Sequence, residues 1–273
     1  MRAIPAAPIL LAALTLLSAP PAGAATPERA AIPSADGTAL DALVFRPDGP
    51  GPHPAIILLH GCGGRDDRQG AMMPRDADWA SRLAADGYLV VAPDSYGSRG
   101  LGQQCTVSNR AVLPGRERRA DALGVRAWLA ARPDVRAGAI ALMGFSNGGS
   151  TVVHTADAPG FAAFVALYPG CSPILRKRGW RPASPMLLLI GEADDWTPAA
   201  PCAALAAAHP AITYRAYRGA HHGFDAPNSP VRALSGRAFS ADGSGRVHAG
   251  TDPAAREDAL ARVPAFLAAT LPR

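Results

Sequence analysis

Lysine is almost absent from this sequence of 273 residues, since Lys177 is the only lysine among 27 basic residues. The formal net charge of +5 therefore comes almost entirely from arginine. These arginines are scattered, with short clusters only at residues 116–119 and 176–178, and no RNA- or DNA-binding motif accompanies them. The pattern predicts a solvated basic surface and no nucleic-acid partner.

Cysteine is also scarce. The four cysteines form no C-x-x-C pair, and none has a histidine beside it at metal-ligand spacing. We therefore expect no metal site and no cofactor. Four cysteines can form two disulfides in three different ways, and composition alone leaves all three open for Cys62, Cys105, Cys171 and Cys202.

The N-terminal segment lacks an apolar run of the ~20 residues that a membrane-spanning helix needs. Its apolar residues 9–17 follow Arg2 and precede the small residues 22–24, which is the layout of a secretory signal peptide. We predict a signal peptide over residues 1–24 and a protein exported to the periplasm or the medium. This interpretation is favoured over an uncleaved anchor, so no stable membrane anchor is expected after cleavage. Disulfides persist in such a compartment.

The remainder of the chain, residues 25–273, has the length of one α/β domain. Buried-strand patterns alternate with helical ones, which predicts a mostly parallel central sheet with helices on both faces. Strands are expected at residues 39–46, 55–59, 88–92, 139–143, 161–167, 186–190 and 212–217, and helices at residues 79–85, 117–131, 148–155, 201–208 and 254–269. Residues 225–252 have little pattern, and we expect a solvated loop there in preference to a lid.

The sequence G-x-S-x-G occurs at residues 144–148, directly after an apolar strand and before a predicted helix. This context is typical of a nucleophile elbow, in which a sharp turn exposes a serine hydroxyl at the end of a strand. A glycine-rich turn without chemistry is the simpler interpretation. A phosphate-binding loop is disfavoured because no lysine follows Gly149. We therefore predict Ser146 as the nucleophile.

A serine nucleophile needs a base that takes its proton and an acid that orients this base. Carboxylates lie at residues 192–195, after the strand at 186–190, and paired histidines lie at 221–222, after the strand at 212–217. The order serine, acid, histidine fits the elbow. The backbone N–H groups of Asn147 and of Cys62, the latter in the segment H-G-C-G-G, are the expected oxyanion donors.

At these residues the chain resembles the dienelactone hydrolase family of α/β-hydrolases. The resemblance is carried by residues 60–64, 93–100, 144–149, 191–198 and 221–225. It implies an α/β-hydrolase fold, with Asp194 as the acid and His222 as the base. Asp195 and His221 are the alternatives in each pair.

Two departures from the family pattern refine the expected activity. Family members that cleave dienelactone have cysteine where this chain has Ser146, and glutamate where it has Gly61. The resemblance thus implies a hydrolase of carboxylic esters or lactones, acting on a small molecule through an acyl-enzyme. An exported peptidase or acyltransferase of the same fold, or a non-catalytic binding protein, are the alternatives.

The layout of the strands also suggests how the cysteines pair. Cys171 follows one strand end, and Cys202 follows the neighbouring loop that carries the carboxylates at residues 192–195, which we call the acid loop. We therefore expect these two cysteines to pair and to leave Cys62 for Cys105. Arg99 could bind a substrate carboxylate or form a structural salt bridge.

Overall fold

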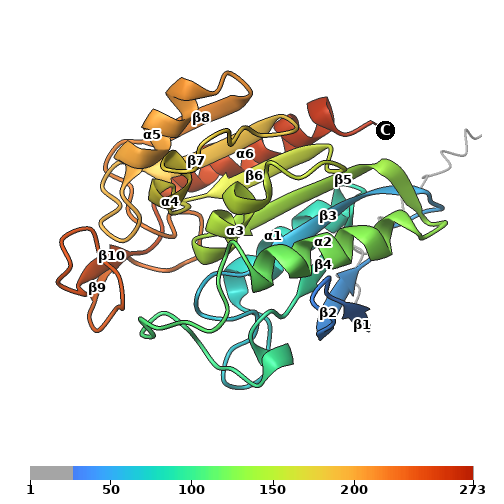
Figure 1. The fold of residues 1–273 in the computed structure, drawn as a ribbon, viewed down its shortest axis with the longest axis horizontal. Helices are drawn as coiled ribbons and strands as arrows, with labels where there is room; N and C mark the ends of the chain where they lie inside the picture. Colours follow the sequence, from blue (N-terminus) through green and yellow to red (C-terminus); the bar gives the residue numbers. More distant parts are fainter. Residues whose placement is uncertain (1–26, 273) are drawn as a thin grey trace, which may run out of the picture.

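The computed structural model describes residues 27–272, so the predicted signal peptide over residues 1–24 lies outside the described residues. An eight-stranded sheet forms the centre of the molecule, in the order β1-β2-β4-β3-β5-β6-β7-β8 (Figure 1). The strands are β1 (Glu28–Pro33), β2 (Ala39–Phe45), β3 (His53–Leu59), β4 (Leu89–Pro93), β5 (Val135–Phe145), β6 (Ala163–Leu167), β7 (Met186–Gly191) and β8 (Ile212–Tyr217). Only the pairs β1–β2 and β2–β4 are antiparallel within it. The predicted mostly parallel sheet is confirmed.

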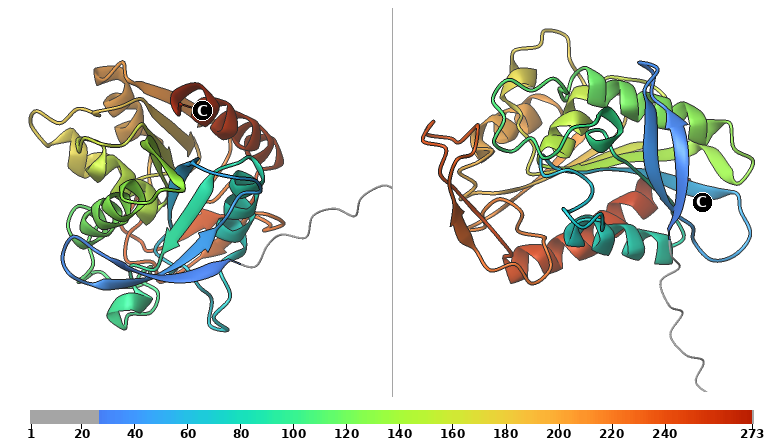
Figure 2. Two further views of the ribbon diagram at one scale, coloured as in Figure 1. Left: turned by 90° about the vertical axis from the view of Figure 1, so that its right-hand side faces the viewer. Right: turned by 90° about the horizontal axis from the view of Figure 1, so that it is seen from below.

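Helices cover both faces of this sheet, as predicted. They are α1 (Pro74–Ala85), α2 (Glu117–Ala130), α3 (Asn147–Thr155), α4 (Ser172–Leu175), α5 (Ala199–Ala208) and α6 (Pro253–Thr270), with a short 3₁₀ turn, η1, at Gly97–Arg99. Helices α1 and α6 lie on one face, and α2 and α3 lie on the other (Figure 2). The architecture is that of an α/β-hydrolase.

Burial explains which strands the sequence revealed and which it did not. All residues of β4, β6 and β7 are buried, because helices cover both sides of a parallel sheet. Strand β1 was missed. It lies at the sheet edge, where only Ile32 is buried and Pro33 ends the strand, so no apolar pattern marks it.

The prediction of a simple solvated loop at residues 225–252 is wrong. This segment contains a small antiparallel ribbon of β9 (Arg232–Leu234) and β10 (Val247–Ala249), at the left of Figure 1. It folds back onto the segment that follows β8, where the Gly250 N–H donates to the His222 carbonyl over 3.0 Å. Backbone hydrogen bonds therefore hold this segment against the sheet's carboxyl edge.

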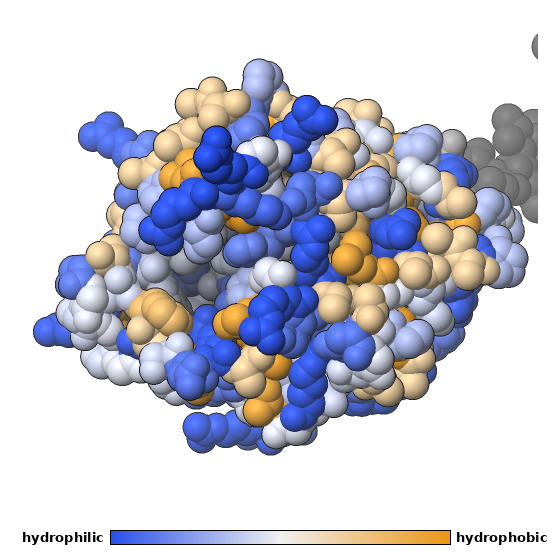
Figure 3. Space-filling model, viewed as in Figure 1, coloured by the Kyte–Doolittle hydropathy of each residue, from blue (hydrophilic) through white to orange (hydrophobic). Residues whose placement is uncertain are grey.

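Two disulfides are present, Cys62–Cys105 and Cys171–Cys202, the pairs expected from the strand layout. Within residues 27–272, no helix combines the length and apolar character required to cross a bilayer. Hydrophilic residues dominate the face in Figure 3, and hydrophobic ones form small, separate patches. Such small patches are ordinary for the surface of a water-exposed domain.

Candidate active site

The elbow residue Ser146 joins β5 to α3 with φ 52° and ψ −115°. A non-glycine residue with positive φ is strained, and such strain is common at functional sites. Backbone segments of the chain approach one another closely around this turn. A Cβ on Gly144 would lie 2.5 Å from Gly148, and one on Gly148 would lie 2.1 Å from the Leu59 carbonyl oxygen. The glycines of G-x-S-x-G are therefore required by packing.

A continuous chain of hydrogen bonds joins Ser146, His222 and Asp194. His222 Nε2 lies 2.9 Å from Ser146 Oγ, and its Nδ1 lies 2.8 Å from Asp194 Oδ2. The three residues come from the ends of β5, β8 and β7 and are 7%, 4% and 5% exposed, respectively. The structure thus brings together one member of each predicted pair, and leaves Asp195 and His221 outside this chain.

The acid loop holds Asp194 in a defined orientation. Its Oδ1 accepts hydrogen bonds from the backbone N–H groups of Trp196 and Thr197, over 2.9 and 2.8 Å. Its Oδ2 faces His222 and the Thr197 hydroxyl, which is 2.9 Å away. Because these donors fix the orientation of the carboxylate, Asp194 can accept the Nδ1–H of His222 and leave Nε2 free to accept a proton from Ser146.

The loop after β3 approaches the elbow from the other side. A Cβ on Gly61 would lie 3.6 Å from the Cβ of Ser146, so this loop borders Ser146 directly. The Cys62–Cys105 disulfide and a 2.7 Å hydrogen bond from the Gln104 N–H to the Cys62 carbonyl hold it in place. The predicted oxyanion donors, the N–H groups of Cys62 and Asn147, therefore belong to backbone segments that border Ser146.

His60 shapes this loop. Its Nε2 accepts the Ser95 N–H over 3.2 Å, so its Nδ1 carries the proton and donates to the Gly61 carbonyl over 2.8 Å. Burial and the nearby Arg118 charge hold the pKa of His60 well below its usual range. His60 is neutral and has both nitrogens occupied.

Sequence reasoning missed a buried arginine that joins the two halves of the site. Arg118 donates to Asn147 Oδ1 over 2.6 Å and to the His60 carbonyl over 2.7 Å. It is 0% exposed, so the prediction of a solvated arginine surface is wrong here. Tyr96 adds a 2.9 Å hydrogen bond to the same Asn147 oxygen. A signal was present, because Arg118 shares the buried face of α2 with Val125 and Leu129 at helical spacing.

A second buried polar cluster lies beneath His222. Tyr168, directly after β6 with φ 39°, packs its ring edge-on against His222 at 4.7 Å. Its hydroxyl donates to Asp225 over 2.6 Å and lies 3.2 Å from Arg75. Trp79 donates to the same carboxylate over 2.7 Å. Burial and the Asp225 carboxylate raise the pKa of Tyr168 well above its usual range, although the Arg75 charge opposes them. The phenol therefore stays a hydrogen-bond donor beneath His222.

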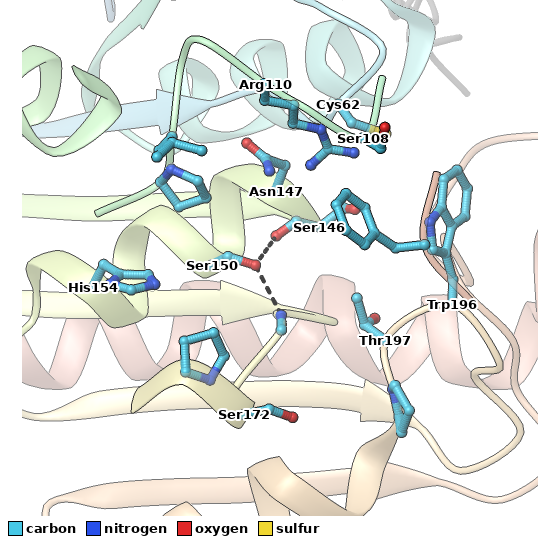
Figure 4. A pocket seen from close by; sticks show the side chains of 16 residues that line it. Cys62, Ser108, Arg110, Ser146, Asn147, Ser150, His154, Ser172, Trp196 and Thr197 are labelled. Atoms are coloured by element: carbon cyan, nitrogen blue, oxygen red, sulfur yellow. Dashed lines mark hydrogen bonds between the residues drawn. The ribbon is translucent and has the colours of Figure 1, made fainter. Parts of the chain in front are cut away.

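Ser146 lies between two cavities. The larger, about 400 Å³, is shown in Figure 4, where Arg110 and Trp196 flank Ser146. Its apolar wall includes Leu113, Pro114, Pro173 and Phe239. The smaller cavity, about 190 Å³, is the one that His222 lines. Phe239 in the larger cavity and Arg232 in the smaller show that residues 225–252 form part of both walls.

Arg99 takes the structural alternative. Its guanidinium pairs with Asp121 and with Asp36, each over 2.7 Å. Asp121 is 0% exposed and needs a partner for its buried charge. Arg99 therefore holds η1 against α2, and it lines neither of the two cavities beside Ser146.

Comparisons with known proteins agree with this architecture. A family model described as the dienelactone hydrolase family matches residues 40–271. A comparison with curated protein sequences finds no significant match.

Three solved structures illustrate the similarity in fold. A Klebsiella pneumoniae protein assigned as a dienelactone hydrolase is 23% identical, with 89% of this chain and 98% of that chain covered and a TM-score of 0.67. P91, a dienelactone hydrolase-like promiscuous phosphotriesterase from metagenomic libraries, is 20% identical, with coverages of 92% and 100% and a TM-score of 0.68. Esterase 2 of Thermogutta terrifontis is 20% identical, with coverages of 93% and 99% and a TM-score of 0.63.

Proposed function

The chain belongs to the dienelactone hydrolase family, and on this premise we propose that it is an exported serine hydrolase of carboxylic esters or lactones. The observation that carries the proposal is the continuous hydrogen-bonded chain Ser146–His222–Asp194. Two disulfides favour an oxidising compartment, which agrees with the expected export.

In the proposed acylation step, His222 Nε2 accepts the proton of Ser146 as Oγ attacks the substrate carbonyl carbon. Asp194 stabilises the resulting imidazolium through Nδ1–H. The former carbonyl oxygen becomes negatively charged and accepts hydrogen bonds from the N–H groups of Cys62 and Asn147. Such donors contribute about 3 kcal/mol each to stabilisation of the transition state.

The intermediate then collapses, and the bond between the carbonyl carbon and the alcohol oxygen breaks. His222 returns its proton to this oxygen, and the acyl group stays on Ser146. In deacylation, His222 takes a proton from water, the hydroxide attacks the acyl carbon, and Ser146 Oγ leaves with the proton that His222 returns. A lactone follows the same steps, with its alcohol still tethered to the acyl chain.

The positions of the cavities suggest how a substrate lies. The leaving oxygen must receive its proton from His222 Nε2, so the alcohol departs on the side that His222 lines. That is the cavity of about 190 Å³, whereas the acyl group faces the cavity of about 400 Å³. We therefore propose a small alcohol and a larger acyl group.

Arg110 refines the class of acyl group. Its Nε donates to the carbonyls of Gln104 and Val107, and its guanidinium stacks on Phe239 at 4.8 Å. Among residues 27–272 no carboxylate forms a salt bridge with it, and burial lowers the pKa of Arg110 below its usual range. An arginine remains charged even so. An acid group on the distal end of the acyl chain would neutralise this cation.

The first test is labelling with a fluorophosphonate probe, together with acid release from methyl esters of increasing acyl length. Ser146→Ala should abolish labelling and lower kcat by a factor of about 10⁴ or more. A folded wild-type protein that neither labels nor hydrolyses any ester would contradict the proposal and favour a non-catalytic binding protein.

Arg110→Met tests the acyl preference, with Arg176→Met on an exposed surface as the matched control. Methyl esters of diacids should lose about tenfold or more in kcat/KM, the loss expected for one charge-assisted hydrogen bond. Methyl esters of neutral acids of equal length should change little. Equal losses on both substrates would mean that Arg110 only supports the pocket wall.

A further inference from the structure

Two doublets follow neighbouring strands of the sheet, the acid doublet Asp194-Asp195 after β7 and the histidine doublet His221-His222 after β8. Each doublet contributes only one residue to the hydrogen-bonded chain at Ser146. The other member of each doublet, Asp195 or His221, lies outside that chain. Asp195 and His221 meet at a third residue, His248 of β10, to form a second cluster outside the first.

The three side chains converge closely. Each offers one ligand atom, and these atoms lie within 4.8 Å of one another. Asp195 Oδ2 lies 2.7 Å from His248 Nδ1, and its Oδ1 accepts the His248 N–H over 2.7 Å. The rings of His221 and His248 are 5.2 Å apart between centroids. Three segments distant in sequence therefore place two imidazoles and one carboxylate around a single point.

One buried nitrogen of a cluster residue lacks a hydrogen-bond partner. His221 Nδ1 is buried and forms no hydrogen bond with the residues described. A buried polar atom without a partner costs free energy, so such an atom calls for an explanation. A ligand that accepts a lone pair at this position would remove the cost.

We propose that Asp195, His221 and His248 bind a divalent transition-metal ion, of which Zn²⁺ fits best. Two imidazoles and a carboxylate are ligands that Zn²⁺ takes at about 2.0–2.2 Å, with a fourth position left for water. Tetrahedral bonds of that length place ligand atoms roughly 3.3 Å apart. Asp195 Oδ2 and His248 Nδ1, which are 2.7 Å apart, must therefore separate by about 0.6 Å, and pairs near the 4.8 Å limit must approach by about 1.5 Å. Rotation of these side chains can supply both changes, because none of the three is fully buried. His248 binds through Nδ1 once its proton resides on Nε2.

The ion would join three segments. Asp195 belongs to the loop that carries Asp194, His221 precedes His222, and His248 belongs to the ribbon of β9 and β10. The same segments already contact one another through the backbone, since the Ala241 N–H donates to the Asp195 carbonyl over 2.7 Å. The ion thus clamps residues 225–252 onto the acid and base loops. The sequence prediction of no metal site considered only the cysteines, and it missed positions that are separated by 26 and 27 residues.

The test is calorimetric titration of the untagged protein with Zn²⁺, beside thermal unfolding. We expect one ion per chain, a Tm that rises with Zn²⁺ concentration, and at least tenfold weaker binding in both His248→Ala and Asp195→Asn. Co²⁺ in place of Zn²⁺ should give the absorption spectrum of a tetrahedral site, lost in the same variants.

Two controls separate this site from other histidines. His53→Ala, at the amino end of β3, removes another partly exposed histidine and should leave binding unchanged. His222→Ala should also retain it, which places the ion outside the hydrogen-bonded chain at Ser146. Unaltered binding in His248→Ala, a loss as large in His53→Ala, or a loss confined to His222→Ala would overturn the proposal. Because the readout is binding, failure of this test leaves the proposed hydrolase activity standing, and the reverse also holds.

Discussion

Two Asp–His pairs formed by neighbouring residues of the acid loop differ in environment much more than in geometry. Asp194 lies 2.8 Å from His222 Nδ1, and Asp195 lies 2.7 Å from His248 Nδ1. The side chains of the first pair are 0% and 6% exposed, whereas those of the second are 36% and 48% exposed. The distance between two groups therefore says little about their chemistry, because the solvent around them decides how strongly they interact.

The buried pair interacts in a medium of low effective dielectric constant, where hydrogen bonds and interactions between charges are stronger than in water. Trp196 covers it, with its ring 4.7 Å from the His222 ring. The exposed pair is screened by water and salt. We therefore expect the first pair to support proton transfer and the second to act as a weak clip or, with the proposed ion, as a ligand set.

The largest effect on kcat should come from replacing the acid of the buried pair, and replacing the acid of the exposed pair should have little effect. Asp194→Asn should lower kcat by a factor of about 10³–10⁴, because the amide NH2 can donate to Nδ1 and favour the tautomer whose Nε2 carries the proton and cannot accept one from Ser146. Asp195→Asn should change kcat by less than about tenfold. Steady-state kinetics with one ester measures both. The reverse order would make Asp195 the functional acid.

An intermediate effect should follow when the buried pair is exposed to solvent. Trp196→Ala removes the ring over His222 and admits water, which weakens the interaction with Asp194. We expect kcat to fall by about tenfold, or ~1.4 kcal/mol in activation free energy. Trp128→Ala, a partly buried tryptophan of α2, is the control for general destabilisation. An equal fall in both variants would show that Trp196 contributes only to packing.

The smallest effect concerns the exposed pair without metal. We would measure the free energy of unfolding in a double-mutant cycle of Asp195→Ala and His248→Ala, with a chelator present and at about pH 6. The coupling energy between the two residues should be below about 1 kcal/mol. The coupling should decrease in 1 M salt because the charges are screened. A coupling of several kcal/mol, unchanged by salt, would show that this pair is shielded from solvent as the first pair is.

Local patterns in the sequence were sufficient for the order of the longer elements from β2 to α6, but not for the short η1, α4, β9 and β10. Apolar runs marked the strands covered on both faces, and the glycines at 144 and 148 marked the sharp turn at Ser146. The edge strand β1 was invisible because five of its six residues are not buried and carry no apolar alternation. Sequence also led to the cysteine pairs, because strand order places the ends of successive elements near one another.

By itself, then, the sequence determined the sheet, the sharp turn at Ser146 and the order in which the serine, the carboxylates and the histidines follow one another. It did not distinguish Asp194 from Asp195, or His221 from His222, without the family resemblance. Only the tertiary structure placed one member of each doublet toward Ser146 and the other toward His248, and only the tertiary structure buried Arg118. The reason is physical, since side-chain direction in a loop and the burial of a charge depend on segments that are remote in sequence.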